Sequence, residues 1–357
     1  MTPRRGWRPH PLDYLLLAAP LALAAALLHW GAAPVFFLSG LAIVPLARLI
    51  GGATEELAGK LGVAVGGLLN ATFGNATELI IAVFALQAGL YDVVKASLIG
   101  SVLGNVLAVV GTSFLFGGWR RERQRFDRTA AGAGSVQLAL AGGALLVPAL
   151  LASTTRISPT TVHGLSVAVA LVLLAAYGAG LIFSLRTHAH LFTEDDEVAL
   201  HGTARASPRR SVAVLLAATV GVALLSELLV QGVEGLTKGL GWSPVFVGVI
   251  LVAILGNVAE HASAVTVAMR DRMDLSLSIA LGSATQIALF VAPVLVLLGL
   301  VLNKPMDLLF DPFEVVAVVG AVGLVNLVVA DGESTWLEGA QLLAAYAVLA
   351  AAFFVHP

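Results

Sequence analysis

The sequence Gly-Asn-Ala-Thr-Glu at residues 74–78 returns as Gly-Asn-Val-Ala-Glu at residues 256–260, and each copy places a carboxylate inside a long apolar segment. A charged side chain near the centre of a membrane helix costs about 2.5–3.5 kcal/mol on insertion scales, so a matched pair indicates function. The shift of 182 residues that aligns Glu78 with Glu260 also aligns residues 100–101 with residues 282–283, both Gly-Ser. Two such halves are typical of secondary transporters built from structural repeats.

The composition is that of a polytopic membrane protein. The 357 residues are 58% hydrophobic and only 12% charged, and the mean hydropathy is +0.93. Cysteine is absent, which excludes disulfides, thiolate metal sites and cysteine redox chemistry. We therefore expect the lipid bilayer as the surrounding partner and no nucleic acid, while homo-oligomer formation stays open.

Apolar windows of spanning length predict an all-α fold with eleven transmembrane helices. They fall near residues 12–30, 33–50, 61–88, 93–117, 131–151, 160–185, 211–230, 244–268, 275–301, 313–330 and 338–355. The chain then divides into an N-terminal segment with the leading helix, two five-helix repeats and an acidic, His-containing linker between the repeats. These divisions are residues 1–32, 33–186 and 211–357, with the linker at 187–210.

The distribution of basic residues predicts the orientation. With the N-terminus in the cytoplasm, 16 of the 20 Lys and Arg residues fall on the cytoplasmic side, which is the side that positive residues favour. The spans that carry Glu78 and Glu260 then run in opposite directions, so the repeats are inverted. We expect a multi-pass protein of the cell (inner) membrane, with the C-terminus on the opposite side.

The repeated motif predicts a cation site. On a helix, residues at i−7, i−3 and i share one face, and glycine four residues before each Glu favours a local break that would expose backbone carbonyls. Carboxylate, amide and carbonyl oxygens form a hard ligand set that suits Ca²⁺. The expected ligands are Glu78, Glu260, Asn75, Asn257, Ala71, Ala253, Gly74 and Gly256.

A second polar layer follows each motif. Ser101 and Asn105 lie one turn apart in the span after Glu78, and Ser283 and Gln286 occupy the corresponding stretch of the other half. We expect these four residues to take part in the site directly or through water. Serine and asparagine also join membrane helices without touching a substrate, so a packing role stays open.

Two further features are candidates for proton coupling and regulation. His261 adjoins Glu260 but points about 100° away around the helix, so it could relay protons or pack between helices. The linker carries an acidic run that could bind cations and regulate transport, although most such runs are only solvated. Its members are Glu194, Asp195, Asp196 and Glu197.

These motifs, together with Gly-Ser-Ala-Thr-Gln at 282–286 and Asp-Gly-Glu-Ser-Thr-Trp at 331–336, resemble the calcium/proton antiporters of the calcium:cation antiporter superfamily. The resemblance covers nearly the whole chain. It implies eleven spans with inverted repeats of spans two to six and seven to eleven, exchange of Ca²⁺ for H⁺ without a cofactor, and a central cation site at Glu78 and Glu260. It also implies that spans two and seven slide or rock to switch access.

Physical chemistry supplies a mechanism for such exchange. Two facing carboxylates repel each other, so we expect them to take up protons when no cation is bound and to release them to a divalent cation. Sodium-coupled relatives place Ser or Thr where this chain has Gly74 and Gly256, and keep an acid in the following span, where this chain has Gln286. This departure argues against sodium coupling.

Other functions stay open at the level of sequence. A Na⁺- or Mn²⁺-handling exchanger of the same superfamily is the main alternative. A passive channel would show flux that ignores the pH gradient. An intramembrane hydrolase would need a nucleophile–base pair or a metal triad, and the sequence shows neither, so we do not expect an enzyme.

Overall fold

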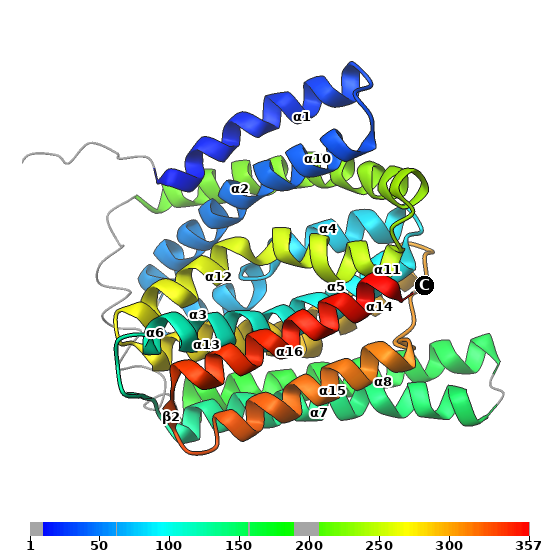
Figure 1. The fold of residues 1–357 in the computed structure, drawn as a ribbon. Helices are drawn as coiled ribbons and strands as arrows, with labels where there is room; N and C mark the ends of the chain where they lie inside the picture. The colour runs from blue at the N-terminus through cyan, green and yellow to red at the C-terminus, as the bar shows by residue number, and fades with distance from the viewer. Residues whose placement is uncertain (1–9, 62, 156–157, 189–206, 357) are drawn as a thin grey trace, which may run out of the picture.

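The computed structural model describes residues 10–61, 63–155, 158–188 and 207–356, which form a helical bundle with one short two-stranded ribbon (Figure 1). Within these ranges, eight helical segments are long and apolar enough to cross a membrane. They are Ala32–Leu61, Tyr91–Gly118, Arg128–Thr154, Pro159–Thr187, Pro208–Leu240, Pro244–Met269, Met273–Val301 and Trp336–Val355. Three shorter apolar segments accompany them, at Pro11–Leu27, Ala76–Gln87 and Pro312–Val328. The predicted all-helical, multi-pass character is confirmed.

Breaks and π-helical turns divide several segments into consecutive elements. In chain order the elements are η1 (Pro11–Leu17), α1 (Ala18–Leu27), α2 (Ala32–Leu61), α3 (Val63–Phe73), α4 (Ala76–Gln87), α5 (Tyr91–Leu103), η2 (Gly104–Val109), α6 (Val110–Gly118), β1 (Gln124–Arg125), α7 (Arg128–Thr154), α8 (Pro159–Ile182), η3 (Phe183–Thr187), α10 (Pro208–Leu240), α11 (Pro244–Phe246), η5 (Val247–Val252), α12 (Ala253–Met269), α13 (Met273–Gln286), η6 (Ile287–Val291), α14 (Ala292–Val301), α15 (Pro312–Val328), β2 (Glu333–Ser334) and α16 (Trp336–Val355).

The helices α2 and α10 pack along each other on one side of the bundle, with α1 outside them and α7, α8 and α15 on the opposite side (Figure 1). Both are longer than predicted, because α2 continues to Leu61 and α10 to Leu240. A hydropathy window detects only the apolar part of a helix. The helix itself can extend further, because its backbone hydrogen bonds form within the helix whether the side chains are apolar or polar. The extension of α2 packs against the start of α10, where the Ser211 hydroxyl donates to the Glu56 carboxylate at 2.7 Å.

The two motif segments have different backbone conformations. In the first half the helix breaks between α3 and α4, where Gly74 and Asn75 lie in a turn. In the second half α12 runs through Gly256 without interruption, so the expected break there is wrong. The two Asn side chains also differ, because Asn257 donates to the Ala253 carbonyl one turn earlier at 2.9 Å as well as across to Ser101. Asn75 donates across to Gln286.

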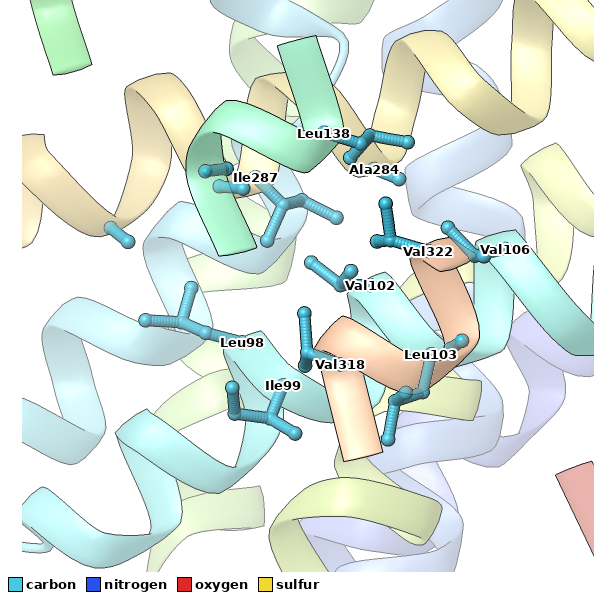
Figure 2. Close-up of a cluster of buried hydrophobic side chains, with 14 of the residues drawn as sticks. Leu98, Ile99, Val102, Leu103, Val106, Leu138, Ala284, Ile287, Val318 and Val322 are labelled. Carbon is cyan, nitrogen blue, oxygen red and sulfur yellow. The ribbon is translucent and has the colours of Figure 1, made fainter. Parts of the chain in front are cut away.

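An apolar core lies where α5 and η2 meet α7, α13 and α15. Figure 2 shows Val102 lying near Ile287 and Val106 near Val322, with Leu138 and Val318 on neighbouring helices. All of these side chains are buried. The core thus packs one face of α5, and the polar residues Ser101 and Asn105 are left to another face of the same helix.

The arginine-rich loop 119–127 joins two other loops, 270–272 and 329–335, at one end of the bundle, which we call the arginine end. Strands β1 and β2 pair here, with Gln124 opposite Ser334. The buried Gln124 side chain donates to the Ala268 carbonyl at 3.1 Å and to Asp271 at 2.8 Å. The arginine end therefore holds the last turn of α12, the helix that carries Glu260.

Candidate functional site

The first part of the candidate site is the turn between α3 and α4. Asn75 is buried at the start of α4, and its amide donates to the side-chain oxygen of Gln286 at the end of α13. A Cβ atom added to Gly74 would lie 3.3 Å from that same Gln286 oxygen. The turn of the first repeat and the second polar layer of the other repeat are therefore in direct contact.

The second part is a buried hydrogen-bond network across both halves. Asn257 of α12 donates to the Ser101 hydroxyl at 3.0 Å, and Asn105 of η2 donates to Ser283 at 3.1 Å and to Oδ1 of Asn257 at 3.4 Å. Ser283 in turn donates to Oδ1 of Asn75 at 3.5 Å. Six polar residues predicted for the site thus form one connected network, which we call the polar layer. They are Asn75, Ser101, Asn105, Asn257, Ser283 and Gln286.

Both motif carboxylates meet at this layer. Glu78 lies in the first turn of α4 and packs across Gly256 of the opposite motif, where an added Cβ would be 3.4 Å from the Glu78 Cγ. The charges of Glu78 and Glu260 lie close enough to interact, and Ser283 interacts with the Glu260 carboxylate. Gly256 therefore faces Glu78 from within a continuous helix, at a distance where an added Cβ would make ordinary van der Waals contact.

Three oxygens of the layer lack a hydrogen-bond partner among the described residues, although they are buried. They are Oε2 of Glu78, Oε2 of Glu260 and Oδ1 of Asn105. A buried acceptor without a donor is costly, and two of these oxygens belong to carboxylates. A bound proton or a hard cation would satisfy them, so the arrangement suits either.

Several predicted ligands occupy other roles. The Ala253 carbonyl accepts from Asn257, and the Gly74 amide donates to the Asn70 carbonyl at 2.7 Å. Of Ala71 the structure describes only its place in α3. His261 turns toward η2, where its ring lies 3.9 Å from a Cβ added to Gly104, and its Nε2 is buried without a partner in the described part of the chain.

Two features fall outside the predicted set or outside the described residues. The charge of Glu55 of α2 interacts with that of Glu260, although Glu55 was not among the predicted site residues. The signal was the acidic pair Glu55-Glu56 at the end of an apolar helix. The acidic run at 194–197 lies outside the described residues, so its regulatory role stays a prediction.

The chain is similar to known proteins over its whole length. The family described as sodium/calcium exchanger protein matches residues 31–186 and 210–355. A Ca²⁺/H⁺ antiporter of Synechocystis is 50% identical, with 96% of each chain covered. The Ca²⁺/H⁺ antiporter ChaA of Bacillus subtilis is 42% identical, covering 96% of this chain and 98% of its own.

A solved structure agrees with these relatives. The structure of native YfkE has a TM-score of 0.84 and 41% identity, and the match covers 97% of this chain and 100% of YfkE. The matched residues include both motifs and the polar layer between them. The chain belongs to the sodium/calcium exchanger protein family.

Proposed function

We propose that this protein exchanges Ca²⁺ for H⁺ across a membrane by alternating access, with Glu78 and Glu260 forming one site shared by the cation and the protons. The observation that carries this proposal is a pair of buried carboxylate oxygens, one from each repeat, that receive no hydrogen bond from the described residues and lie at a single polar layer. The relatives support the choice of ions, since those from Synechocystis and Bacillus subtilis are named Ca²⁺/H⁺ antiporters.

The donor set fits a hard divalent cation as cargo. Ca²⁺ takes six to eight oxygen ligands at about 2.3–2.6 Å, from carboxylates, carbonyls and water. Glu78, Glu260 and the Asn105 carbonyl oxygen would supply protein ligands. Asn75, Asn257, Ser101, Ser283 and Gln286 already hydrogen-bond among themselves, so they position the ligands and leave the remaining sites to water.

Protons compete for the same oxygens. When Ca²⁺ leaves, two carboxylates remain near each other, and their mutual repulsion favours proton uptake. Each carrier state then crosses with either a cation or protons. We infer that His261 takes part in this proton exchange, because it follows Glu260 directly. We also infer that Ala71 and Gly74 contribute backbone oxygens to the cation near the break between α3 and α4.

The membrane arrangement follows the sequence analysis. We infer eleven crossings, which are the eight long segments, the shorter segments Pro11–Leu27 and Pro312–Val328, and α3 with α4 together, because the 12 residues of α4 are too few to cross alone. The arginine end then lies in the cytoplasm. Under that orientation the physiological direction is export of Ca²⁺ from the cytoplasm, driven by inward proton flow.

The test is ⁴⁵Ca²⁺ uptake into proteoliposomes that carry either a proton gradient or a sodium gradient. We expect uptake to follow the proton gradient and to ignore sodium, because Gln286 stands where sodium-coupled relatives keep an acid. Uptake driven by sodium would overturn the proton-coupled proposal, and flux independent of both gradients would indicate a channel. Competition by Mn²⁺ in the same assay measures how selective the site is.

A further inference from the structure

Two helices of opposite repeats cross backbone to backbone beside the polar layer. A Cβ added to Gly100 of α5 would overlap the Val249 carbonyl of η5, and one added to Gly248 would lie 2.6 Å from the Ala96 Cβ. Both glycines precede the polar layer along helices that end at the arginine end. This crossing therefore closes the bundle on the side of the layer away from the arginine end.

The internal repeat predicts a second crossing, equivalent to that of α5 and η5, between α13 and α3 on the other side of the polar layer. The shift of 182 residues that relates the motifs pairs Gly100 with Gly282 and Gly248 with Gly66. It also pairs Val249 with Gly67 and Ala96 with Ser278. The two contact glycines are thus glycine in both halves, and the other two equivalents are also small residues.

The equivalent crossing is open in this structure. A Cβ added to Gly282 would meet no atom of the described residues within 4 Å, and Ser278 is exposed. Gly66 instead packs against the Ala58 backbone of α2, and Gly67 packs against Leu185 of η3. In the part of the chain that the structure describes, the extensive contacts of α3 are with α2.

The open face of α13 nevertheless points toward the first motif. Ser278, Gly282 and Gln286 are spaced four residues apart and share one side of the helix, and Gln286 contacts Asn75 at the break between α3 and α4. The two helices thus meet at the polar layer, and α13 presents small residues along the open face toward the arginine end. A glycine inside a helix costs about 0.5–1 kcal/mol relative to alanine, and no contact in this state requires one at 282.

We propose that Ser278 and Gly282 of α13 close against Gly66 and Gly67 of α3 to form a second gate, at the arginine end, when the cation site opens to the other side. The proposal rests on the alternating access of the proposed function and adds the residues that make contact. The break at residues 74–75 lets α3 leave α2 while α4 keeps Glu78 in place. A glycine at 282 is then required in the state in which α13 and α3 are in contact, and that state differs from the one described here.

The first test is Gly282→Val, with Gly143→Val as its matched control. Gly143 of α7 also has no atom of the described residues within 4 Å of an added Cβ, but it faces outward and lies at no crossing. We expect both variants to fold and to bind ⁴⁵Ca²⁺ in detergent as the wild type does. Overpacking costs about 1–3 kcal/mol, so Gly282→Val should slow exchange in proteoliposomes roughly 5- to 150-fold. Exchange equal to that of Gly143→Val would overturn the gate.

A second test does not depend on folding of the valine variant. Because the chain has no cysteine, Ser278→Cys gives a single thiol that a bulky maleimide can label by addition after the protein has folded. Labelling should stop exchange and leave ⁴⁵Ca²⁺ binding intact, whereas labelling Gly143→Cys should change neither. Continued exchange after full labelling, or loss of Ca²⁺ binding with it, would overturn the gate. A wild-type protein without proton-coupled exchange would instead refute the proposed function.

Discussion

Acidification should weaken Ca²⁺ binding, and the change in the apparent dissociation constant per pH unit should reveal how many carboxylates release protons when Ca²⁺ binds. Glu78 and Glu260 each present one buried oxygen without a donor within the described ranges, so at most two protons compete with one cation. Each displaced proton changes the apparent dissociation constant tenfold per pH unit. Where both carboxylates are protonated in the free protein, the constant should rise up to about 100-fold per pH unit, and about tenfold where only one is.

Glu260→Gln gives the prediction its sharpest form. Removing one partner of a buried charge interaction costs about 2–5 kcal/mol, so Ca²⁺ binding should weaken roughly 30- to 5,000-fold. The slope should also fall to at most tenfold per pH unit, because Glu78 alone remains to exchange a proton for the cation. Ca²⁺ titrations of purified protein between about pH 5 and 8, read by calorimetry or ⁴⁵Ca²⁺ binding, measure both quantities.

Two results would refute this reasoning. A wild-type affinity that ignores pH across the range means that protons and Ca²⁺ do not share these carboxylates. A steep slope that persists in Glu260→Gln means that other groups release the second proton. His261 and Glu55 are then the titratable side chains to replace next, since His261 follows Glu260 directly and the charge of Glu55 interacts with it.

Three further predictions concern transport and stability. Glu78→Gln and Glu260→Gln should each abolish exchange in proteoliposomes while size-exclusion profiles stay those of the folded protein, and substantial exchange by either would remove the two-carboxylate site. Replacing the four acids at 194–197 with neutral residues should leave the Ca²⁺ dependence of transport unchanged, and a shifted affinity would indicate a regulatory site. Gln124→Leu should cost about 1–3 kcal/mol, because it removes both hydrogen bonds of a buried side chain, to the Ala268 carbonyl and to Asp271, at about 0.5–1.5 kcal/mol each. Glu333→Gln should cost less in the same thermal melts, since its two arginine partners are largely exposed and such pairs contribute about 0–1 kcal/mol each.

The sequence was sufficient to predict which residues meet at the polar layer. Asn75, Asn257, Ser101 and Ser283 belong to two short motifs and the spans that follow them, and an inverted repeat brings equivalent positions together at its centre. Their spacing along helices placed them on shared faces. In apolar surroundings these polar side chains find most of their partners in one another.

Other features required three-dimensional information. The extended end of α2 is too polar to register in a hydropathy window, yet it packs against the start of α10. Gln124 lies in a loop, and nothing in its sequence neighbourhood indicates that its amide reaches the last turn of α12, 144 residues away. Glu55 is also remote in sequence from Glu260, and only the fold shows that their charges interact.

The largest error was to give both motifs the same backbone, and it has a physical cause. The two halves share glycines at equivalent positions, so a sequence argument assigns them one conformation. An alternating-access protein holds its halves in different conformations, because a crossing that is closed on one side of the site must be open on the other. Here the first half is broken at residues 74–75 and closed at Gly100, while the second half is continuous through Gly256 and open at Gly282. The repeated sequence therefore specifies a pair of conformations, and each half adopts one of them at a time.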